Sequence, residues 1–421
     1  MAKKEYLWEV GQPPPELHVH SLAKHEVLRT YLNRYLKVLV SNPQIDRFRL
    51  TLIDGFSGGG LYLHAITKKE LAGSPLIFLE ATQDAAREIN IERTKPFTLD
   101  AHYFFIEENP QTLEYLQKLL VERGYEALLT EGRIKPLQGE FANRANDVIE
   151  FIQQKGRKGR AIFLLDQYGF LDVPFPLLRQ IFSALPNAEV ILTFAVDAFG
   201  NFLTDSPQTR SRLAKMGLDG RLNLTRIAAA KGASDRRFSI QAELSPIFYK
   251  ESGARFYTPF FITSRESNRD YWLVHLSMHA RARDEMVKLH WQLQNHFRHN
   301  GGAGLNMLGY DPSKDQALTG QPDFNFDASA RELSIRSLRE ELPELIIQRR
   351  DGVSFQQLLE GTCNTTPASS DIYREVLDEL LVNKDITVTG KDGGQRRKGG
   401  RVKGTDVIQA PRQPSLFFRK K

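Results

Sequence analysis

The chain contains a single cysteine, Cys363, among its 421 residues. One cysteine excludes an internal disulfide framework and any cysteine-based zinc site. The sequence also lacks an apolar run of roughly 18 residues, the length that a membrane-spanning helix requires. Its opening residues, which run into Pro13-Pro14-Pro15, carry no apolar secretory segment. We therefore expect a protein of the reducing cytoplasm with no membrane partner.

Apolar and aromatic residues are plentiful. Hydrophobic residues make up 41% of the chain, charged residues 26%, and there are 26 phenylalanines and 13 tyrosines. This composition is typical of a soluble globular protein with a substantial core, and it excludes a wholly disordered chain. A length of 421 residues predicts two or three domains, or one large domain with a small appendage.

Positive charge is concentrated at the C-terminal end. The net charge is +6, yet residues 385–421 hold ten basic and three acidic residues, which leaves the rest of the chain close to neutral. A basic tail on a neutral body indicates a polyanionic partner, most commonly nucleic acid. The alternative is a tail that only improves solubility.

After a proline-rich arm (1–17) and a helix (21–39), apolar strands alternate with helical segments. Five strands are predicted, at 49–53, 102–106, 134–137, 160–165 and 189–194. This alternation predicts an α/β fold with a Rossmann-like parallel sheet, covered by helices on both faces. Ligands of such sheets bind at the carboxyl ends of the strands.

Later segments complete this domain (18–299) and begin another. Residues 200–250 read as a helical insertion, followed by two adjacent strands that add a late antiparallel pair, and then by a helix. A glycine-rich and polar linker follows (300–330). The last part (331–421) shows three helices and a two-stranded ribbon, the outline of a winged helix. The strands are predicted at 256–263, 271–278, 386–389 and 406–408, and the helices at 281–298, 331–348, 354–360 and 369–382.

A glycine-rich turn follows the first strand of the sheet. It reads Asp54-Gly-Phe56-Ser-Gly58-Gly-Gly60, and its glycines allow a sharp turn and the close approach of a ligand. It lacks the Lys-Ser/Thr ending of a phosphate-binding loop and departs from Gly-x-Gly-x-x-Gly. It resembles motif I of S-adenosylmethionine-dependent methyltransferases, which implies cofactor contacts at Asp54, Phe56, Gly58 and Gly60. The alternative is a purely structural strand-to-helix turn.

Acidic residues follow the next two strands. Glu107 can accept hydrogen bonds from both ribose hydroxyls of a nucleotide-like cofactor. It lies 53 positions after Asp54, where about 20 are usual, so we expect an insertion over 66–98; Glu80 is the rival if 76–79 is a strand. After the third strand, Glu140 is a candidate for the adenine amine, with Phe141 against the ring.

The fourth strand ends in Asp166-Gln167-Tyr168-Gly169. Asp166 can take a proton or orient an acceptor, and Tyr168 can stack on a flat base. The segment resembles the Asp/Asn-Pro-Pro-aromatic motif of amino-methyltransferases, but both prolines are absent. We expect no metal site, because the pair His18 and His20 has no nearby acids.

Taken together, these segments resemble the three-Cys-motif partner protein (TcmP) family of bacterial, Rossmann-like, methyltransferase-like proteins. The matching segments are Lys24-His25 with Tyr31, Asp54 to Gly60, Gly73-Ser74-Pro75-Leu76, Phe105-Ile106-Glu107, Asp166 to Gly169 and Tyr271 to Val274. The resemblance implies a C-terminal winged helix, S-adenosylmethionine as cofactor with Ser74 among its contacts, and a partner protein with three cysteines. The family usually shows Asp-Pro-Phe-Gly where this chain has Asp166 to Gly169.

The leading hypothesis is an S-adenosylmethionine-dependent methyltransferase that acts on nucleic acid. Asp166 and Tyr168 would face the acceptor, and the basic wing would bind phosphates through Arg396, Arg397, Lys398, Arg401 and Lys403. The alternative is a catalytically silent adaptor that binds nucleic acid and a partner protein. The sequence leaves open whether the acceptor is DNA, RNA, protein or a small molecule.

Overall fold

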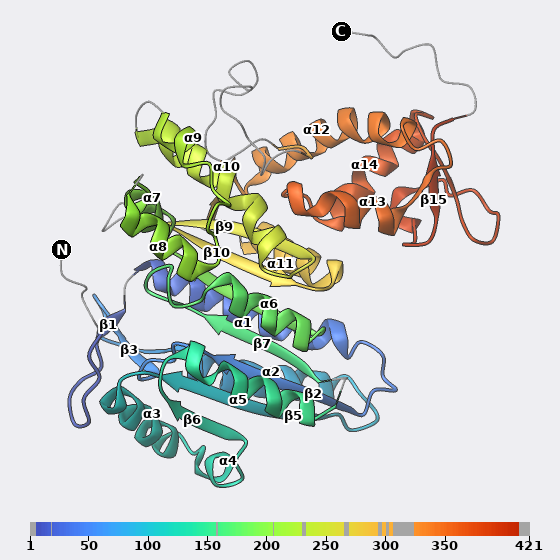
Figure 1. The fold of residues 1–421 in the computed structure, drawn as a ribbon. Coiled ribbons are helices and arrows are strands. Elements are labelled where there is room, and N and C mark those ends of the chain that lie inside the picture. Colours follow the sequence, from blue (N-terminus) through green and yellow to red (C-terminus); the bar gives the residue numbers. More distant parts are fainter. Residues whose placement is uncertain are drawn as a thin grey trace. The chain divides into compact units, whose positions relative to one another are not determined.

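The computed structural model divides the chain into two compact units (Figure 1). The first comprises Met1–Leu289 and the second His290–Lys421. The structure describes residues 6–17, 19–156, 159–204, 206–229, 233–264, 269–293, 297–299, 303–305 and 324–411. Most of the expected linker, the basic residues after 411 and His18 lie outside these ranges. No helix among the described residues is long and apolar enough to cross a membrane.

A mostly parallel sheet forms the centre of the first unit. Its seven strands lie in the order β6-β5-β2-β7-β8-β10-β9, and the first five are parallel. Strand β10 runs antiparallel to both of its neighbours, as the sequence predicts for the late pair. The bounds are β2 Arg47–Asp54, β5 Thr98–Glu107, β6 Ile134–Gln138, β7 Arg160–Leu165, β8 Ala188–Phe194, β9 Phe256–Ser264 and β10 Arg269–Ser277. The Rossmann-like α/β prediction is therefore confirmed.

Helices cover the sheet and connect its parallel strands. Helix α1 packs against α2 on one side, and α5 contacts α6 on the other (Figure 1). Local signals fix where helices begin: Pro75 lies in the first turn of α2, and the Asn109 side chain caps α3. The bounds are α1 Val19–Leu39, α2 Ser74–Ile91, α3 Pro110–Glu122, α4 Glu126–Thr130, α5 Phe141–Gln154, α6 Phe175–Ala184 and α11 Ala280–Leu293.

The residues after β8 form the expected helical insertion. Four helices replace the strand–helix rhythm. The first of them packs against β10, and the first and the third both pack against the fourth. Phe199 of the first helix and Phe248 of the fourth are buried. The bounds are α7 Val196–Phe202, α8 Pro207–Met216, α9 Leu224–Ala229 and α10 Ala233–Glu251.

A small second sheet accounts for the long gap between Asp54 and Glu107. Strands β3 (Leu61–His64) and β4 (Glu70–Ala72) form a hairpin, and β1 (Glu16–Leu17) of the N-terminal arm pairs with β3. The extra segment is thus this hairpin, whereas the expected 66–98 insertion mostly contains α2, the ordinary crossover helix. The structure also contradicts a strand at 76–79, because those residues lie within α2.

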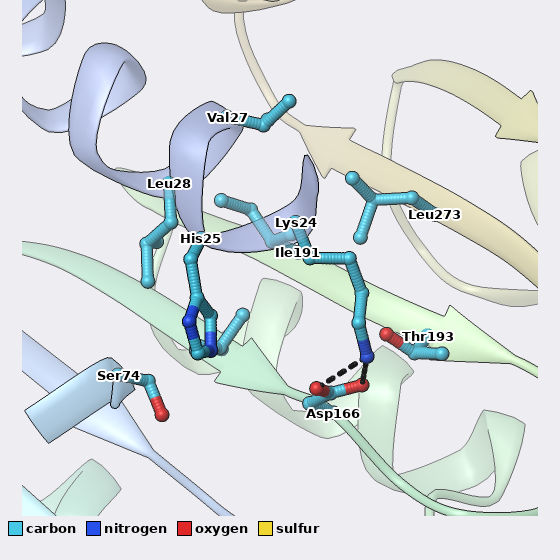
Figure 2. Close-up of a pocket in the computed structure, with 10 residues that line it drawn as sticks. Lys24, His25, Val27, Leu28, Ser74, Asp166, Ile191, Thr193 and Leu273 are labelled. Atoms are coloured by element: carbon cyan, nitrogen blue, oxygen red, sulfur yellow. Dashed lines mark hydrogen bonds and ion pairs between the residues drawn. The ribbon is translucent and has the colours of Figure 1, made fainter. Parts of the chain in front are cut away.

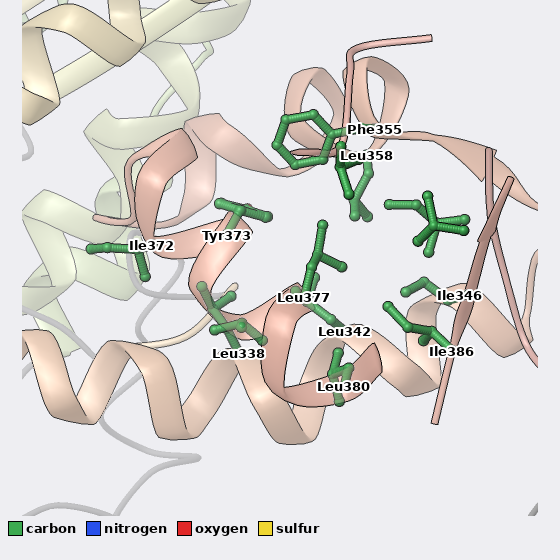
Figure 3. Packing of buried hydrophobic residues seen from close by; sticks show 14 of the residues in the cluster. Leu338, Leu342, Ile346, Phe355, Leu358, Ile372, Tyr373, Leu377, Leu380 and Ile386 are labelled. Carbon is green, nitrogen blue, oxygen red and sulfur yellow. The ribbon is translucent and has the colours of Figure 1, made fainter. Parts of the chain in front are cut away.

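The second unit has the winged-helix arrangement that the sequence predicts. Three helices, α12, α13 and α14, pack around one apolar core whose centre includes Leu338, Leu377 and Phe355 (Figure 3). The bounds are α12 Ala328–Ile347, α13 Phe355–Thr362, α14 Ser370–Val382, β13 Val353–Ser354, β14 Thr387–Thr389 and β15 Val407–Gln409. The strands form a three-stranded sheet in the order β13-β15-β14, and β13 is the strand that the sequence did not indicate.

One predicted helix was wrong at its end. The helix expected to reach Arg298 stops at Leu293, and β11 (Phe297–His299) pairs instead with β12 (Phe324–Asn325). The partner strand lies more than twenty residues away, so local periodicity carries no signal of it.

The loop between β14 and β15, residues 390–406, is the wing, and it rests directly on α14. A Cβ at Gly399, where η3 (Gly399–Arg401) begins, would lie 2.1 Å from the carbonyl oxygen of Arg374 and 2.6 Å from the Asp378 nitrogen. These are backbone atoms of a helix and cannot rotate away. Only glycine permits this close approach.

We therefore expect Gly399→Ala to push the wing off α14 and to cost about 1–3 kcal/mol of stability, as overpacking usually does. Gly400→Ala is the matched control, because a Cβ there meets nothing within 4 Å. Hydrogen exchange of the α14 amides in the full chain measures the effect. Equal protection of α14 in the two variants would contradict the close packing.

Candidate functional site

The carboxyl ends of the parallel strands gather acidic residues at one edge of the sheet. Asp54 and Glu107 are the last residues of β2 and β5, and Asp166 directly follows β7. Because β2 pairs with both β5 and β7, these three residues end adjacent strands. The structure thus brings together the acids that the sequence analysis chose after the first, second and fourth predicted strands.

The glycine turn after β2 is tied to both neighbouring strands. The Gly55 and Ser57 amides donate to the Leu164 and Ile106 carbonyls at 2.9 and 3.0 Å, and Gly58 N–H donates to a Glu107 carboxylate oxygen at 3.0 Å. Gly58 and Gly60 adopt φ values of +58° and +80°, the left-handed region that favours glycine. The turn is therefore a preformed frame around the Glu107 carboxylate.

Glu107 and Asp54 are both buried in a way that opposes their charge. Burial raises the pKa of Glu107, although the amides of Asn109 and Gly58 donate to its two oxygens. Burial raises the pKa of Asp54 to about 7, against the opposing effect of the Ser74 hydroxyl and the Phe56 amide. Asp54 thus titrates near neutral pH.

Buried polar atoms at the ends of β2 and β7 are left without partners among the described residues. The Asp54 side chain is fully buried; its Oδ1 accepts the Phe56 N–H at 3.2 Å, while Oδ2 has no hydrogen-bond partner among the described residues. The same holds for the buried Ser57 hydroxyl and for Nε2 of Gln167. Buried polar groups normally find partners, so these groups fit a site for a polar ligand.

The N-terminal arm covers the glycine turn. The Trp8 indole is buried, its N–H donates to the Leu61 carbonyl at 2.7 Å, and a Cβ at Gly59 would lie 2.3 Å from the indole ring. Tyr6 connects this indole to Tyr168, with ring centroids 5.7 Å and 6.4 Å apart, respectively. No motif in the arm predicts this contact, and Trp8 is the one residue of the arm that could have suggested a buried anchor.

Helix α1 contributes a cation to the other side of the site (Figure 2). Lys24 Nζ lies 2.6 Å from each carboxylate oxygen of Asp166. Burial opposes ionisation of Asp166, but the charge and hydrogen bonds of Lys24, helped by the Thr193 hydroxyl, prevail and hold its pKa below the ordinary value. Asp166 is therefore a carboxylate at neutral pH.

A small pocket lies beside this ion pair, with a cavity volume of about 20 Å³, enough for a water molecule. Its polar lining comes from α1, α2 and the ends of β7 and β8, and its apolar lining includes Leu164, Ile191 and Leu273. The polar residues are Lys24, His25, Ser74, Asp166 and Thr193 (Figure 2). The pocket joins Ser74 and Asp166, which the sequence analysis assigned to cofactor and acceptor separately.

His25 is the neutral base of this pocket. Burial, assisted by the charge of Lys24, lowers the pKa of His25 to about 4, so the imidazole is uncharged at neutral pH. In the sequence, Lys24 and His25 stand out only through the family resemblance. Their functional placement depends on the packing of α1 over the sheet, which no local motif reveals.

The other predicted site residues differ in their exposure. Phe141 is 1% exposed and packs between Phe56 and Phe163, with both pairs of ring centroids 6.3 Å apart, so its ring belongs to the core in this structure. Glu140 is exposed and accepts a hydrogen bond from Asn143 at 3.3 Å. Tyr168 is 51% exposed.

The rival acid and the basic wing can also be placed. Glu80 lies on α2 and pairs with Arg29 at 2.6 Å, away from any strand end. In the second unit, Arg397, Lys398, Arg401 and Lys403 are exposed, whereas Arg396 is paired with Asp406. Among the described residues, no group of three His, Cys, Asp or Glu side chains could hold a metal ion.

Comparisons with known proteins agree with the two-part organisation. A family model described as a GMT-like wHTH domain matches residues 309–393. A comparison with curated protein sequences found no match.

Three similar solved structures match the larger part of the chain, all remotely. A DUF519-family protein from Legionella pneumophila has a TM-score of 0.33 and 10% identity over 60% of this chain and 84% of its own. The N-terminal domain of human METTL16, in complex with SAH, has a TM-score of 0.33 and 9% identity over 65% and 75%. A SAM-dependent methyltransferase from Agrobacterium tumefaciens has a TM-score of 0.27 and 10% identity over 62% and 63%.

The raised pKa of Asp54 predicts a pH-dependent cost to stability. Between the ordinary pKa of 3.8 and about 7 the folded chain binds more protons at Asp54 than the unfolded chain does, so this residue lowers the free energy of unfolding as pH rises. Asp54→Asn cannot ionise. The difference in free energy of unfolding should therefore move in favour of the variant from pH 4 to pH 8, at about 1.4 kcal/mol per pKa unit.

Urea unfolding of both proteins at pH 4, 6 and 8 measures this difference. His25 titrates in the opposite sense, because its folded pKa is lowered, but it is present in both proteins and cancels. If the difference in free energy of unfolding stays constant with pH, the pKa of Asp54 is not raised in the folded chain.

Packing of Trp8 on the glycine turn predicts that Gly59→Ala releases the arm. The added Cβ would occupy the position of the buried indole, so we expect faster proteolysis before residue 17 and a red shift in tryptophan emission. Gly169→Ala is the control, since a Cβ there meets nothing within 4 Å. If both variants keep the emission of the original protein, Trp8 does not rest on this turn.

Proposed function

We propose that the chain is an S-adenosylmethionine-dependent methyltransferase whose acceptor is nucleic acid. The observation that carries the proposal is the buried, unpartnered Oδ2 of Asp54 in a glycine turn, beside Glu107 at the end of the adjacent strand. Adjacent strand ends of this kind are where α/β sheets bind nucleotide-like ligands. The family resemblance of the same segments supports this choice of cofactor.

The residues present fit such a cofactor. Glu107 is held by two backbone amides, and each of its oxygens keeps a lone pair for a hydroxyl group. Asp54 and Ser57 offer unpartnered polar atoms in the same turn. When bound, the cofactor supplies a methyl group made electrophilic by its sulfonium. The Trp8 indole lies on Gly58 and Gly59, so the arm forms one wall of the site or shifts when the cofactor enters.

The pocket beside the turn holds the groups that an acceptor needs. Asp166, kept ionised by Lys24, accepts a hydrogen bond from an amine or hydroxyl and so orients its lone pair. His25 is neutral and can form a hydrogen bond with the acceptor. Tyr168 presents an exposed ring on which a flat base can stack. Alignment of this kind is the main requirement of methyl transfer.

A nucleic-acid acceptor is favoured by the flat ring of Tyr168 and by the exposed cations of the wing. A base within a duplex would have to be flipped out to reach Asp166. Membership of the three-Cys-motif partner family, with a cysteine-containing partner protein, is part of the same proposal and rests on the sequence motifs.

A catalytically silent adaptor is the second candidate. Two observations favour it: Trp8 covers the glycine turn, and Lys24 already binds both oxygens of Asp166. In this case the winged helix would position a partner protein on nucleic acid while the sheet binds no donor.

Calorimetry with S-adenosylhomocysteine and transfer of a tritiated methyl group to DNA and RNA separate these functions. We expect saturable binding by the original chain and loss of at least tenfold in affinity for Asp54→Ala. Asp166→Ala should bind normally yet lose transfer by about 100-fold or more, the usual contribution of a positioned catalytic group. Asp147→Ala, an exposed acid on α5, is the control.

Each readout excludes one candidate. Binding without transfer to any pool supports the adaptor. No heat with either the donor or its demethylated product removes the methyltransferase proposal altogether.

A further inference from the structure

Helix α14 occupies the place of the third helix of a winged helix, the one that usually enters a DNA groove. Its exposed and half-exposed faces are acidic: α14 carries four carboxylates and one cation. These residues are Asp371, Glu375, Asp378, Glu379 and Arg374. A helix in a groove lies between two phosphate strands, so this charge opposes insertion of α14.

Polar side chains of α14 also form hydrogen bonds and ion pairs within the second unit. Glu375 pairs with Arg331 of α12 at 3.1 Å, and Glu379 pairs with Arg339 at 3.0 Å. Asp378 accepts the Gly399 N–H at the start of η3. The polar surface of α14 therefore faces α12 and the base of the wing.

Arg374, the only cation of α14, is used in the same way. Its guanidinium donates to the Val402 carbonyl and lies 4.4 Å from the centre of the Phe355 ring. It therefore fastens the wing to the helix, and no cation of α14 remains for phosphate or base contacts.

The wing itself is a preformed loop with an internal charge balance of its own. Asp406, 1% exposed, accepts Arg396 Nε at 2.8 Å and the Lys403 amide at 3.0 Å. Asp392 also pairs with Arg396, at 3.3 Å. Arg396 is thus paired with both acids of the wing. Its expected role as a phosphate ligand is therefore not part of the proposal below.

Five exposed cations of the wing lie outside the ion pairs of Arg396 with Asp392 and Asp406. They are Lys391, Arg397, Lys398, Arg401 and Lys403. None of their side chains forms an ion pair within the described part of the chain. Because Gly399 and Asp406 fix the loop, these charges are presented without the cost of ordering a flexible segment.

We propose that the second unit binds the phosphate backbone of a nucleic-acid duplex through the wing, with α14 held outside the grooves. It anchors the chain without reading sequence, because phosphate contacts carry no sequence information directly. This inference rests on the proposed nucleic-acid acceptor and adds how that acceptor is held. Discrimination among bases is then left to the first unit.

Fluorescence anisotropy with the full chain tests this mode. Two 20-bp DNA duplexes of unrelated sequence and one RNA duplex are titrated at several salt concentrations. We expect affinities for the two DNA duplexes that agree within about threefold. In Arg397→Ala/Lys398→Ala the slope of log affinity against log salt should fall by about 1.8, since each phosphate contact contributes about 0.9.

Arg349→Ala/Arg350→Ala is the matched control, because it removes two adjacent exposed arginines of the same unit outside the wing. An equal loss in both variants would indicate net charge alone and overturn the assignment to the wing. A preference of more than tenfold between the DNA duplexes that is lost in Asp371→Ala would place α14 in a groove and overturn it as well. Comparison of the affinities for the RNA and DNA duplexes shows which kind of duplex supplies the phosphate backbone.

Failure here is distinguishable from failure of the proposed function. Absence of binding to every duplex overturns the wing inference, whereas binding of S-adenosylhomocysteine by the same preparation would leave the donor site in place. The wing variant and its Arg349→Ala/Arg350→Ala control should both keep that binding within twofold, because all four substitutions lie in the other unit.

Discussion

The carboxyl ends of parallel strands lie at the same edge of a sheet, so the residues that follow these strands come close together. The structure of the first unit depends on this constraint. Here the edge receives Asp54, Glu107 and Asp166 on adjacent strands. Negative charge gathered in a partly buried place is costly unless it is compensated. The glycine turn and helix α1 each reduce that cost, through the Gly58 amide and Lys24, respectively.

The three acids are compensated in three different ways. Glu107 is held by backbone amides, Asp166 by Lys24, and Asp54 by one amide and a raised pKa that leaves one oxygen unpartnered. Only the last arrangement remains incomplete, and incompleteness at a buried carboxylate is the physical sign of a site. In the proposed function, Asp54 belongs to the cofactor part of the site, and His25 and the Lys24–Asp166 ion pair belong to the acceptor part.

Acidic residues play an opposite part in the second unit. Asp378, Asp392 and Asp406 organise the wing, and each is used within the unit. Because these acids are paired within the unit, the exposed charged side chains of the wing are mostly cations. The net charge of the whole chain therefore says little about binding. The balance of basic and acidic side chains within the wing is more informative about what the wing can bind.

Strand, turn and helix signals were sufficient for the α/β sheet, the winged helix and the strand-end acids, because buried strands and caps are local patterns. Tertiary packing decided the rest. Trp8 reaches the glycine turn, Lys24 reaches Asp166, and β11 finds β12 only once distant segments meet. Whether Phe141 is open or in the core, and whether Arg396 is free or paired, depends on neighbours in space. The sequence gives the chemical type of each residue. Its burial and its contacts, which depend on the tertiary structure, decide whether the side chain is charged, exposed and free to bind a ligand.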